Sequence, residues 1–227
     1  MLYGYGGFEV SLLPSYLSLV GPAWLERGGV YVSANIRGGG EFGPEWHRAA
    51  LREKRPRAFE DFEAVAEDLI ARGITTPRHL GIHGASNGGL LAGAALTRRP
   101  ELYNGVLIGV PLLDMKRYHL LHSGASWMAE YGDPDNPEDW AFIKDYSPYQ
   151  NIESERLYPV PLLYTSTKDD RVHPGHARKM AAKMLSMGHE VEYYENLEGG
   201  HAGASNNPQV AYFKALSYTY LLDRLKL

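Results

Sequence analysis

The stretch LGIHGASNGGLLAGAAL, residues 80–96, decides the fold. It begins with a short apolar run typical of a buried strand and ends with an apolar run, Leu90–Leu96, at helical spacing. Between them, GASNG at 84–88 fits the pattern Gly-X-Ser-X-Gly. A serine on a tight turn from strand to helix projects its hydroxyl above the sheet, and small flanking residues relieve the crowding. The stretch therefore predicts that Ser86 is a nucleophile and that the backbone N–H of Asn87 faces a developing oxyanion.

Outside this stretch, short apolar runs alternate with longer helical patterns. The runs typical of strands are Leu2–Tyr5, Val30–Ile36, Leu80–His83, Val106–Val110, Pro161–Thr165 and Val191–Tyr194. A first stretch with helical spacing ends at Trp24-Leu25. Further stretches cover Phe59–Ile70, Leu90–Leu96, Ala177–Met187 and Val210–Leu225. This alternation predicts an α/β protein with a mostly parallel sheet of about six strands and helices on both faces. With the serine turn, it indicates the α/β-hydrolase fold, in a single catalytic domain over residues 1–227.

Residues 115–158 interrupt the alternation with a long run of aromatic and turn residues. The aromatic residues include Trp127, Tyr131, Trp140, Tyr146 and Tyr149. Because the run follows the carboxyl end of a predicted strand, we interpret it as an insertion that lines the substrate pocket. The alternative is that it packs on the core and buries its rings there.

The serine turn requires an acid and then a histidine further along the chain. The predicted strand at 161–165 ends in Asp169-Asp170, and the strand at 191–194 leads into a glycine-rich loop that holds His201. Parallel strands bring their carboxyl ends to one edge of the sheet, where Ser86 also lies. We therefore expect His201 to act as general base. Spacing alone does not distinguish Asp169 from Asp170.

Two other patterns suggest a metal or a cofactor. The histidine pairs at i, i+3 are His119 with His122 and His173 with His176. No carboxylate accompanies either pair at useful spacing, so we predict no metal site. Residues 38–43 fit the dinucleotide pattern G-x-G-x-x-G, but Pro44 closes it and Glu60-Asp61 opens a helix instead of ending a second strand. We therefore predict no cofactor.

Charge and composition limit the partners. The net charge is −4, so the chain has no electrostatic reason to bind nucleic acid or an anionic membrane. A solvated loop is the simplest interpretation of the basic cluster Arg48, Arg52, Lys54, Arg55 and Arg57. The absence of cysteine excludes thiolate catalysis and disulfides. With no signal peptide and no long apolar run, we expect a soluble, cytoplasmic protein.

Together these motifs resemble the catalytic domain of the prolyl oligopeptidase family of serine peptidases, nearly end to end. The matching segments are YGYGGF at 3–8, ANIRGGGEFG at 34–43, the turn around Ser86, DDRV at 169–172 and GHAG at 200–203. The resemblance implies that Asp169 is the catalytic acid and that the Tyr5 hydroxyl completes the oxyanion hole with the Asn87 N–H. It also implies substrate contacts: Arg171 to a substrate carbonyl, and Phe8, Trp127 and Tyr131 to a proline ring.

The chain departs from the family pattern in two ways. We expect it to lack the N-terminal β-propeller that screens the family's active site, and to lack the first strands of the hydrolase sheet. An ungated site suits small esters at least as well as peptides, because an ester's leaving group needs less protonation. A carboxylesterase and an inactive interaction module therefore remain as alternatives to a peptidase. The strand Val30–Ile36 should form an unprotected edge, which favours a homo-oligomer.

Overall fold

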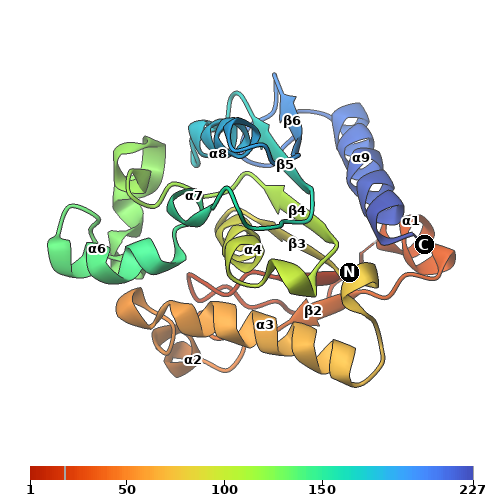
Figure 1. Cartoon of the computed structure of the whole chain (residues 1–227), viewed down its shortest axis with the longest axis horizontal. Helices are drawn as coiled ribbons and strands as arrows, with labels where there is room; N and C mark the ends of the chain where they lie inside the picture. Colours follow the sequence, from red (N-terminus) through yellow and green to blue (C-terminus); the bar gives the residue numbers. More distant parts are fainter. Residues whose placement is uncertain (18, 227) are drawn as a thin grey trace.

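The computed structural model describes residues 1–17 and 19–226. Six strands form one sheet in the order β2-β1-β3-β4-β5-β6, and every neighbouring pair is parallel (Figure 1). The strands are β1 (Leu2–Gly4), β2 (Val32–Ala34), β3 (Gly81–Ala85), β4 (Gly105–Gly109), β5 (Pro161–Ser166) and β6 (Glu192–Asn196). Each overlaps a strand predicted from the sequence, so the predicted mostly parallel α/β sheet is confirmed.

Helices pack on both faces of this sheet. The α-helices are α1 (Val20–Ala23), α2 (Pro44–Arg48), α3 (Pro56–Ala71), α4 (Asn87–Arg98), α5 (Met128–Tyr131), α6 (Pro137–Ile143), α7 (Pro148–Asn151), α8 (Gly175–Ser186) and α9 (Asn207–Leu225). Short 3-10 helices lie at Leu25–Arg27, Arg52–Lys54, Pro77–His79, Pro100–Leu102, Tyr118–Leu120, His122–Trp127 and Lys144–Tyr146. Among the described residues, every helix is too short or too polar to span a lipid bilayer.

Two cores hold the layers together. On one face, α3, α4 and α8 share a buried cluster that includes Phe62, Leu90 and Met180. On the other face, α9 contributes Phe213 and Leu221 to a second cluster with residues of β4 and β5. Since β4 and β5 are buried along their whole length, their nearly continuous apolar runs are those expected of parallel strands covered on both sides.

Residues 115–158 fold into short helices, α5 to α7, which lie at one side of the sheet (left in Figure 1). Tyr118, Tyr131 and Tyr146 are completely buried, whereas Trp127 and Trp140 are partly exposed. For the three tyrosines, the alternative that the insertion packs on the core and buries its rings is therefore correct. The two tryptophans remain available for contacts outside the core.

β2 forms one edge of the sheet, as the sequence predicted for this segment. The strand is shorter than expected, and the Val30 carbonyl before it accepts hydrogen bonds from the Met1 amino group at 2.6 Å and from the Trp24 indole N–H at 2.9 Å. Val30 is 54% exposed, so the apolar edge meets solvent. Self-association through this edge stays a prediction, which light scattering at micromolar concentration would test.

Candidate active site

Ser86 lies on the turn between β3 and α4 with φ 60° and ψ −120°. This positive φ is uncommon for a residue with a side chain, so the surroundings must hold it. The Ser86 N–H donates to the Gly109 carbonyl of β4 at 2.9 Å. A Cβ at Gly84 would overlap the carbonyl oxygen of Gly88, so only glycine fits there. The turn thus has the strained geometry that the motif predicted for this serine.

His201 and the acid come from the loops after β6 and β5, at the same edge of the sheet as Ser86. Nε2 of His201 lies 3.1 Å from Ser86 Oγ, and Nδ1 lies 2.8 Å from Asp169 Oδ2. The structure therefore brings together the three predicted residues in a hydrogen-bonded line. Asp169 is 2% exposed, whereas Asp170 is on the surface. Of the two acids that spacing left open, only Asp169 contacts the histidine.

The second carboxylate oxygen of Asp169 is also held. Oδ1 accepts hydrogen bonds from the backbone N–H groups of Arg171 and Val172, at 3.0 and 2.9 Å. These contacts leave Oδ2 to face His201. A carboxylate anchored in this way can hold the imidazole in one orientation and with its proton on Nδ1.

Tyr5 follows β1 at the same edge and meets Asn87, the first residue of α4. The Asn87 amide donates to the Tyr5 carbonyl at 2.6 Å, which ties the two residues together. Burial raises the pKa of the Tyr5 hydroxyl, while the neighbouring Ser86 hydroxyl and the charge of Arg55 oppose the shift. The phenol therefore stays protonated at neutral pH and can donate. The Asn87 N–H is also available, because the first N–H groups of a helix have no partner within it.

The four predicted substrate contacts differ in their exposure. Phe8 and Trp127 are partly exposed and Arg171 is fully on the surface, so all three are accessible. Tyr131 has no exposed surface. Its hydroxyl donates to Asn87 Oδ1 at 2.7 Å, and its ring meets the Phe8 ring edge-on at 5.6 Å. The expectation that Tyr131 offers its ring to a substrate does not match this burial, because neighbouring side chains enclose the ring.

The basic segment predicted as a solvated loop has a buried member. Arg55 is 1% exposed and donates to Glu130 Oε1 at 2.8 Å and to Asn87 Oδ1. The prediction was wrong for Arg55, because partners far along the chain balance its charge. Arg55 and Glu130 therefore lie next to the site, although no motif in the sequence pointed to either of them. The available signal was weak, because Glu130 is one of four glutamates in the insertion and nothing in the sequence distinguishes it.

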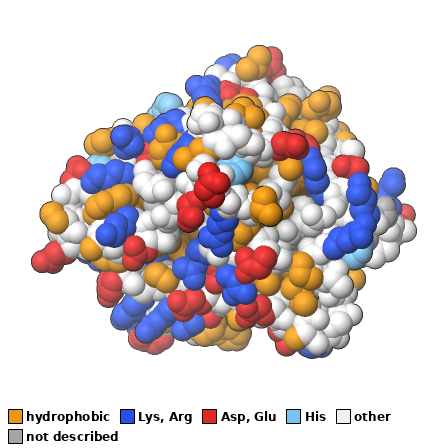
Figure 2. Space-filling view, viewed as in Figure 1, with side chains coloured by type: hydrophobic (Ala, Val, Ile, Leu, Met, Phe, Trp, Pro, Cys, Tyr) orange, Lys and Arg blue, Asp and Glu red, His pale blue; other side chains and the backbone are white. Residues whose placement is uncertain are grey.

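The other members of that segment are partly or fully exposed, and two of them form ion pairs. Arg48 forms an ion pair with Glu45, and Arg52 donates to both carboxylate oxygens of Asp139 at 2.7 and 2.8 Å. Figure 2 shows Lys and Arg side chains interspersed with Asp and Glu side chains on this face. The segment therefore forms no continuous basic patch of the kind that binds nucleic acid.

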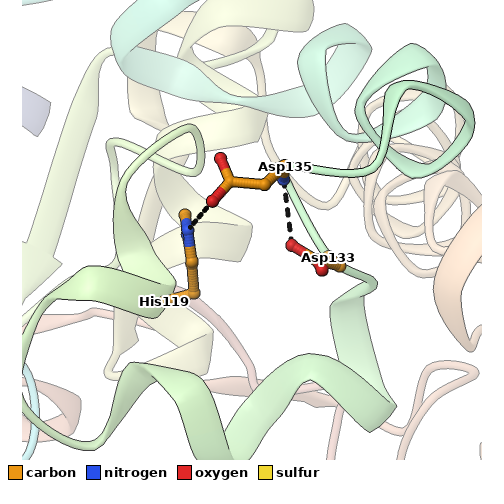
Figure 3. Close-up of side chains that lie close together, drawn as sticks. All are labelled: His119, Asp133 and Asp135. Carbon is orange, nitrogen blue, oxygen red and sulfur yellow. Dashed lines mark hydrogen bonds and ion pairs between the residues drawn. The ribbon is translucent and has the colours of Figure 1, made fainter.

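A separate cluster joins His119, Asp133 and Asp135 (Figure 3). His119 Nε2 lies 2.9 Å from Asp135 Oδ2, so this histidine has a carboxylate partner that spacing did not reveal. Asp133 Oδ1 accepts the Asp135 backbone N–H at 2.9 Å, and the Lys116 ammonium lies 3.8 Å from Asp135. The prediction of no metal site assumed that no carboxylate accompanies the histidine pairs, and that assumption was wrong for His119. His176, from the other histidine pair, is buried, and burial lowers its pKa to about 4. Its Nδ1 accepts the backbone N–H groups of Leu113 and Asp114.

Known proteins share this fold and this stretch of chain. A family model described as the Prolyl oligopeptidase family matches residues 16–227. An uncharacterized peptidase of Sinorhizobium fredii is 54% identical over 225 residues, which cover 99% of this chain and 31% of that protein. A prolyl endopeptidase of Elizabethkingia miricola is 43% identical over 185 residues, which cover 81% of this chain and 26% of that protein.

A solved structure agrees with these relatives. The post-proline cleaving enzyme from Rickettsia typhi superposes with a TM-score of 0.98 at 44% identity, over 100% of this chain and 33% of that one. The chain thus spans about a third or less of the length of the curated relatives it matches. The agreement in sequence and in structure extends over almost every residue, and it confirms the predicted hydrolase architecture. The chain belongs to the prolyl oligopeptidase family.

Proposed function

We propose that this chain is the catalytic part of a serine peptidase that cleaves peptide bonds through an acyl-enzyme. The observation that carries the proposal is the hydrogen-bonded line from Ser86 Oγ through His201 to Asp169. In this mechanism His201 Nε2 takes the Ser86 proton while Oγ bonds to the substrate carbonyl carbon, and Asp169 stabilises the imidazolium that forms. The Tyr5 hydroxyl and the Asn87 N–H donate to the resulting oxyanion.

In the steps that follow, His201 acts first as a general acid and then again as a general base. The imidazolium returns its proton to the leaving amine as the C–N bond breaks, which leaves an ester of Ser86. His201 then takes a proton from water as the water oxygen attacks that ester, and the Ser86 oxygen leaves with the proton. The same groups serve both steps, so the proposal requires no further acid or base.

For the substrate we propose a proline residue on the acyl side of the scissile bond. Two relatives carry names of this kind, a prolyl endopeptidase and a post-proline cleaving enzyme. Phe8 and Trp127 offer partly exposed aromatic surface that suits an apolar, disc-shaped ring. Arg171, on the surface beside Asp169, can donate to a substrate carbonyl.

Three assays test this proposal and separate it from its alternatives. A fluorophosphonate should label the protein at Ser86, since only an activated serine reacts. A proline anilide should be hydrolysed, and a matched anilide with alanine in place of proline should be hydrolysed more slowly. Hydrolysis of a p-nitrophenyl ester alone would indicate an esterase instead. A protein that is not labelled and hydrolyses none of these substrates would be an interaction module.

Replacing Tyr5 by Phe removes one oxyanion donor and no bulk. We expect kcat for the anilide to fall about 10²- to 10³-fold with little change in KM. The loss should be smaller for the activated ester, whose transition state makes a smaller demand on the donors. Steady-state kinetics with both substrates measures the effect.

Tyr3→Phe is the matched control for this experiment. Tyr3 lies two residues earlier on β1, where its ring stacks on Tyr31 and meets His83. The same loss of a hydroxyl there should leave kcat nearly unchanged. Equal kinetics for Tyr5→Phe and the wild type would show that other donors form the oxyanion hole.

A further inference from the structure

Arg55 contacts the side chain of Asn87, whose backbone N–H is one of the two proposed oxyanion donors. Its guanidinium is buried at the start of α3, 5.1 Å from the centre of the Tyr131 ring. One terminal nitrogen donates to Asn87 Oδ1, and the other donates to Glu130 Oε1 at 2.8 Å. A single side chain therefore contacts both the serine turn and the insertion.

Glu130 extends this contact to the segment that carries Tyr5. Its Oε1 also accepts the backbone N–H of Phe8 at 2.9 Å, and its Oε2 pairs with His47 Nε2 at 2.8 Å. Glu130 is 4% exposed, so the carboxylate has exchanged water for these partners. The loop after β1 is thus fastened to the insertion through the same carboxylate that holds Arg55.

Asn87 closes the connection. Its Oδ1 accepts both the Arg55 guanidinium and the Tyr131 hydroxyl, the latter at 2.7 Å, and its Nδ2 donates to the Tyr5 carbonyl at 2.6 Å. There is little free space, because a Cβ at Gly7 would lie 2.5 Å from the Asn87 amide nitrogen and 2.8 Å from an Arg55 nitrogen. Both proposed oxyanion donors therefore belong to residues whose position depends on this group of side chains.

We propose that Arg55, held by Glu130, is a positioning residue for the oxyanion hole and for the aromatic substrate pocket. The inference rests on the proposed function, because it concerns the placement of the Tyr5 and Asn87 donors. The planar guanidinium donates in two fixed directions, one toward the serine turn and one toward the insertion. A lysine keeps the charge but concentrates its donors at one nitrogen, so it cannot hold both segments in the same geometry. A displacement of about 1 Å in such a site can cost about 10²-fold in rate.

Arg55→Lys tests the inference, with Arg98→Lys as matched control. Arg98 also lies over the Phe59 ring and also pairs with a buried glutamate, Glu63, but it does not contact the site. We expect Arg55→Lys to lower kcat for the proline anilide by about 10- to 100-fold, with little change in KM and a smaller loss for the p-nitrophenyl ester. Arg98→Lys should keep the wild-type kcat for both substrates. Thermal unfolding of both variants shows whether they lose similar stability.

A second variant keeps the test decisive if Arg55→Lys does not fold. Tyr131→Phe removes one of the two donors to Asn87 Oδ1 without changing bulk, and should lower kcat for the anilide by about 2- to 10-fold, more than for the ester. Unchanged kcat in the folded Arg55 and Tyr131 variants, beside an active wild type, would overturn the positioning role and leave the proposed function intact. Equal losses for both substrates, matched by Arg98→Lys, would show a merely structural role. A wild type that is neither labelled nor active would overturn both proposals.

Discussion

Ser86→Ala should lower kcat for the proline anilide by about 10⁴- to 10⁶-fold, the largest effect that we expect for any single substitution in this chain. The loss is large because the acyl-enzyme needs an oxygen that can bond to carbon, and alanine offers none. His201 Nε2 then has no hydroxyl to deprotonate, although it stays in place beside Asp169. Stopped assays with long incubation, together with fluorophosphonate labelling, measure the residual activity.

The fold should survive this substitution. Ala and Ser have similar strain at φ 60°, and the substitution removes the contacts of the Ser86 hydroxyl with His201 Nε2 and with the Tyr5 hydroxyl. Thermal unfolding should therefore change little. Ser166→Ala is the matched control: this buried serine ends β5, and its hydroxyl has no partner among the described residues. It should keep nearly full activity, whereas substantial turnover by Ser86→Ala would refute the nucleophile assignment.

Local patterns were sufficient for the sheet and for the serine turn. β4 and β5 were predicted from apolar runs, and such runs mark parallel strands because both faces of the strand are covered. The turn at 84–88 was predicted because the backbone there admits only small residues. Each of these features depends on a few consecutive residues, which is why one sequence can reveal it.

The triad was predicted because its members follow parallel strands, but other contacts between distant segments were not predictable from local patterns. Arg55 and Glu130 are 75 residues apart, and His119 and Asp135 are 16 apart, with no periodic pattern to connect them. Tyr131 was assigned to the substrate pocket by resemblance, but its hydroxyl is directed at Asn87 and its ring is enclosed. Packing decides such cases, because a buried charge or hydroxyl is stable only where a partner from another segment meets it.

The two adjacent acids show the same limit most clearly. Spacing along the chain does not separate Asp169 from Asp170, and only the family resemblance favoured Asp169, yet one residue along the loop turns a side chain from the interior to solvent. Asp169 is enclosed by the backbone N–H groups of Arg171 and Val172 and by the His201 ring. Asp170 is on the surface. The two acids should therefore respond very differently to the same substitution.

Asp169→Asn should lower kcat about 10⁴-fold, and Asp170→Asn should change it by far less. The surroundings dictate how an asparagine would sit. Two backbone N–H groups donate to the Oδ1 position, so the amide oxygen must stay there and the NH₂ group must face His201 Nδ1. An NH₂ group only donates, so Nδ1 would become an acceptor and the ring proton would move to Nε2. Nε2 would then carry a proton and donate it to a hydrogen bond with Ser86 Oγ. A protonated Nε2 cannot accept the proton of the Ser86 hydroxyl.

Asp169→Asn should therefore lose kcat without losing its fold. Asparagine has nearly the volume of aspartate and keeps its contacts to the loop, so thermal unfolding of Asp169→Asn should stay close to that of the wild type. The kcat for the anilide and the rate of fluorophosphonate labelling should fall together, because both need Ser86 to be deprotonated by His201. A large loss for Asp170→Asn with a small one for Asp169→Asn would assign the acid to the exposed residue. It would also require this loop to rearrange in the working enzyme, since Asp170 does not meet His201 in the structure.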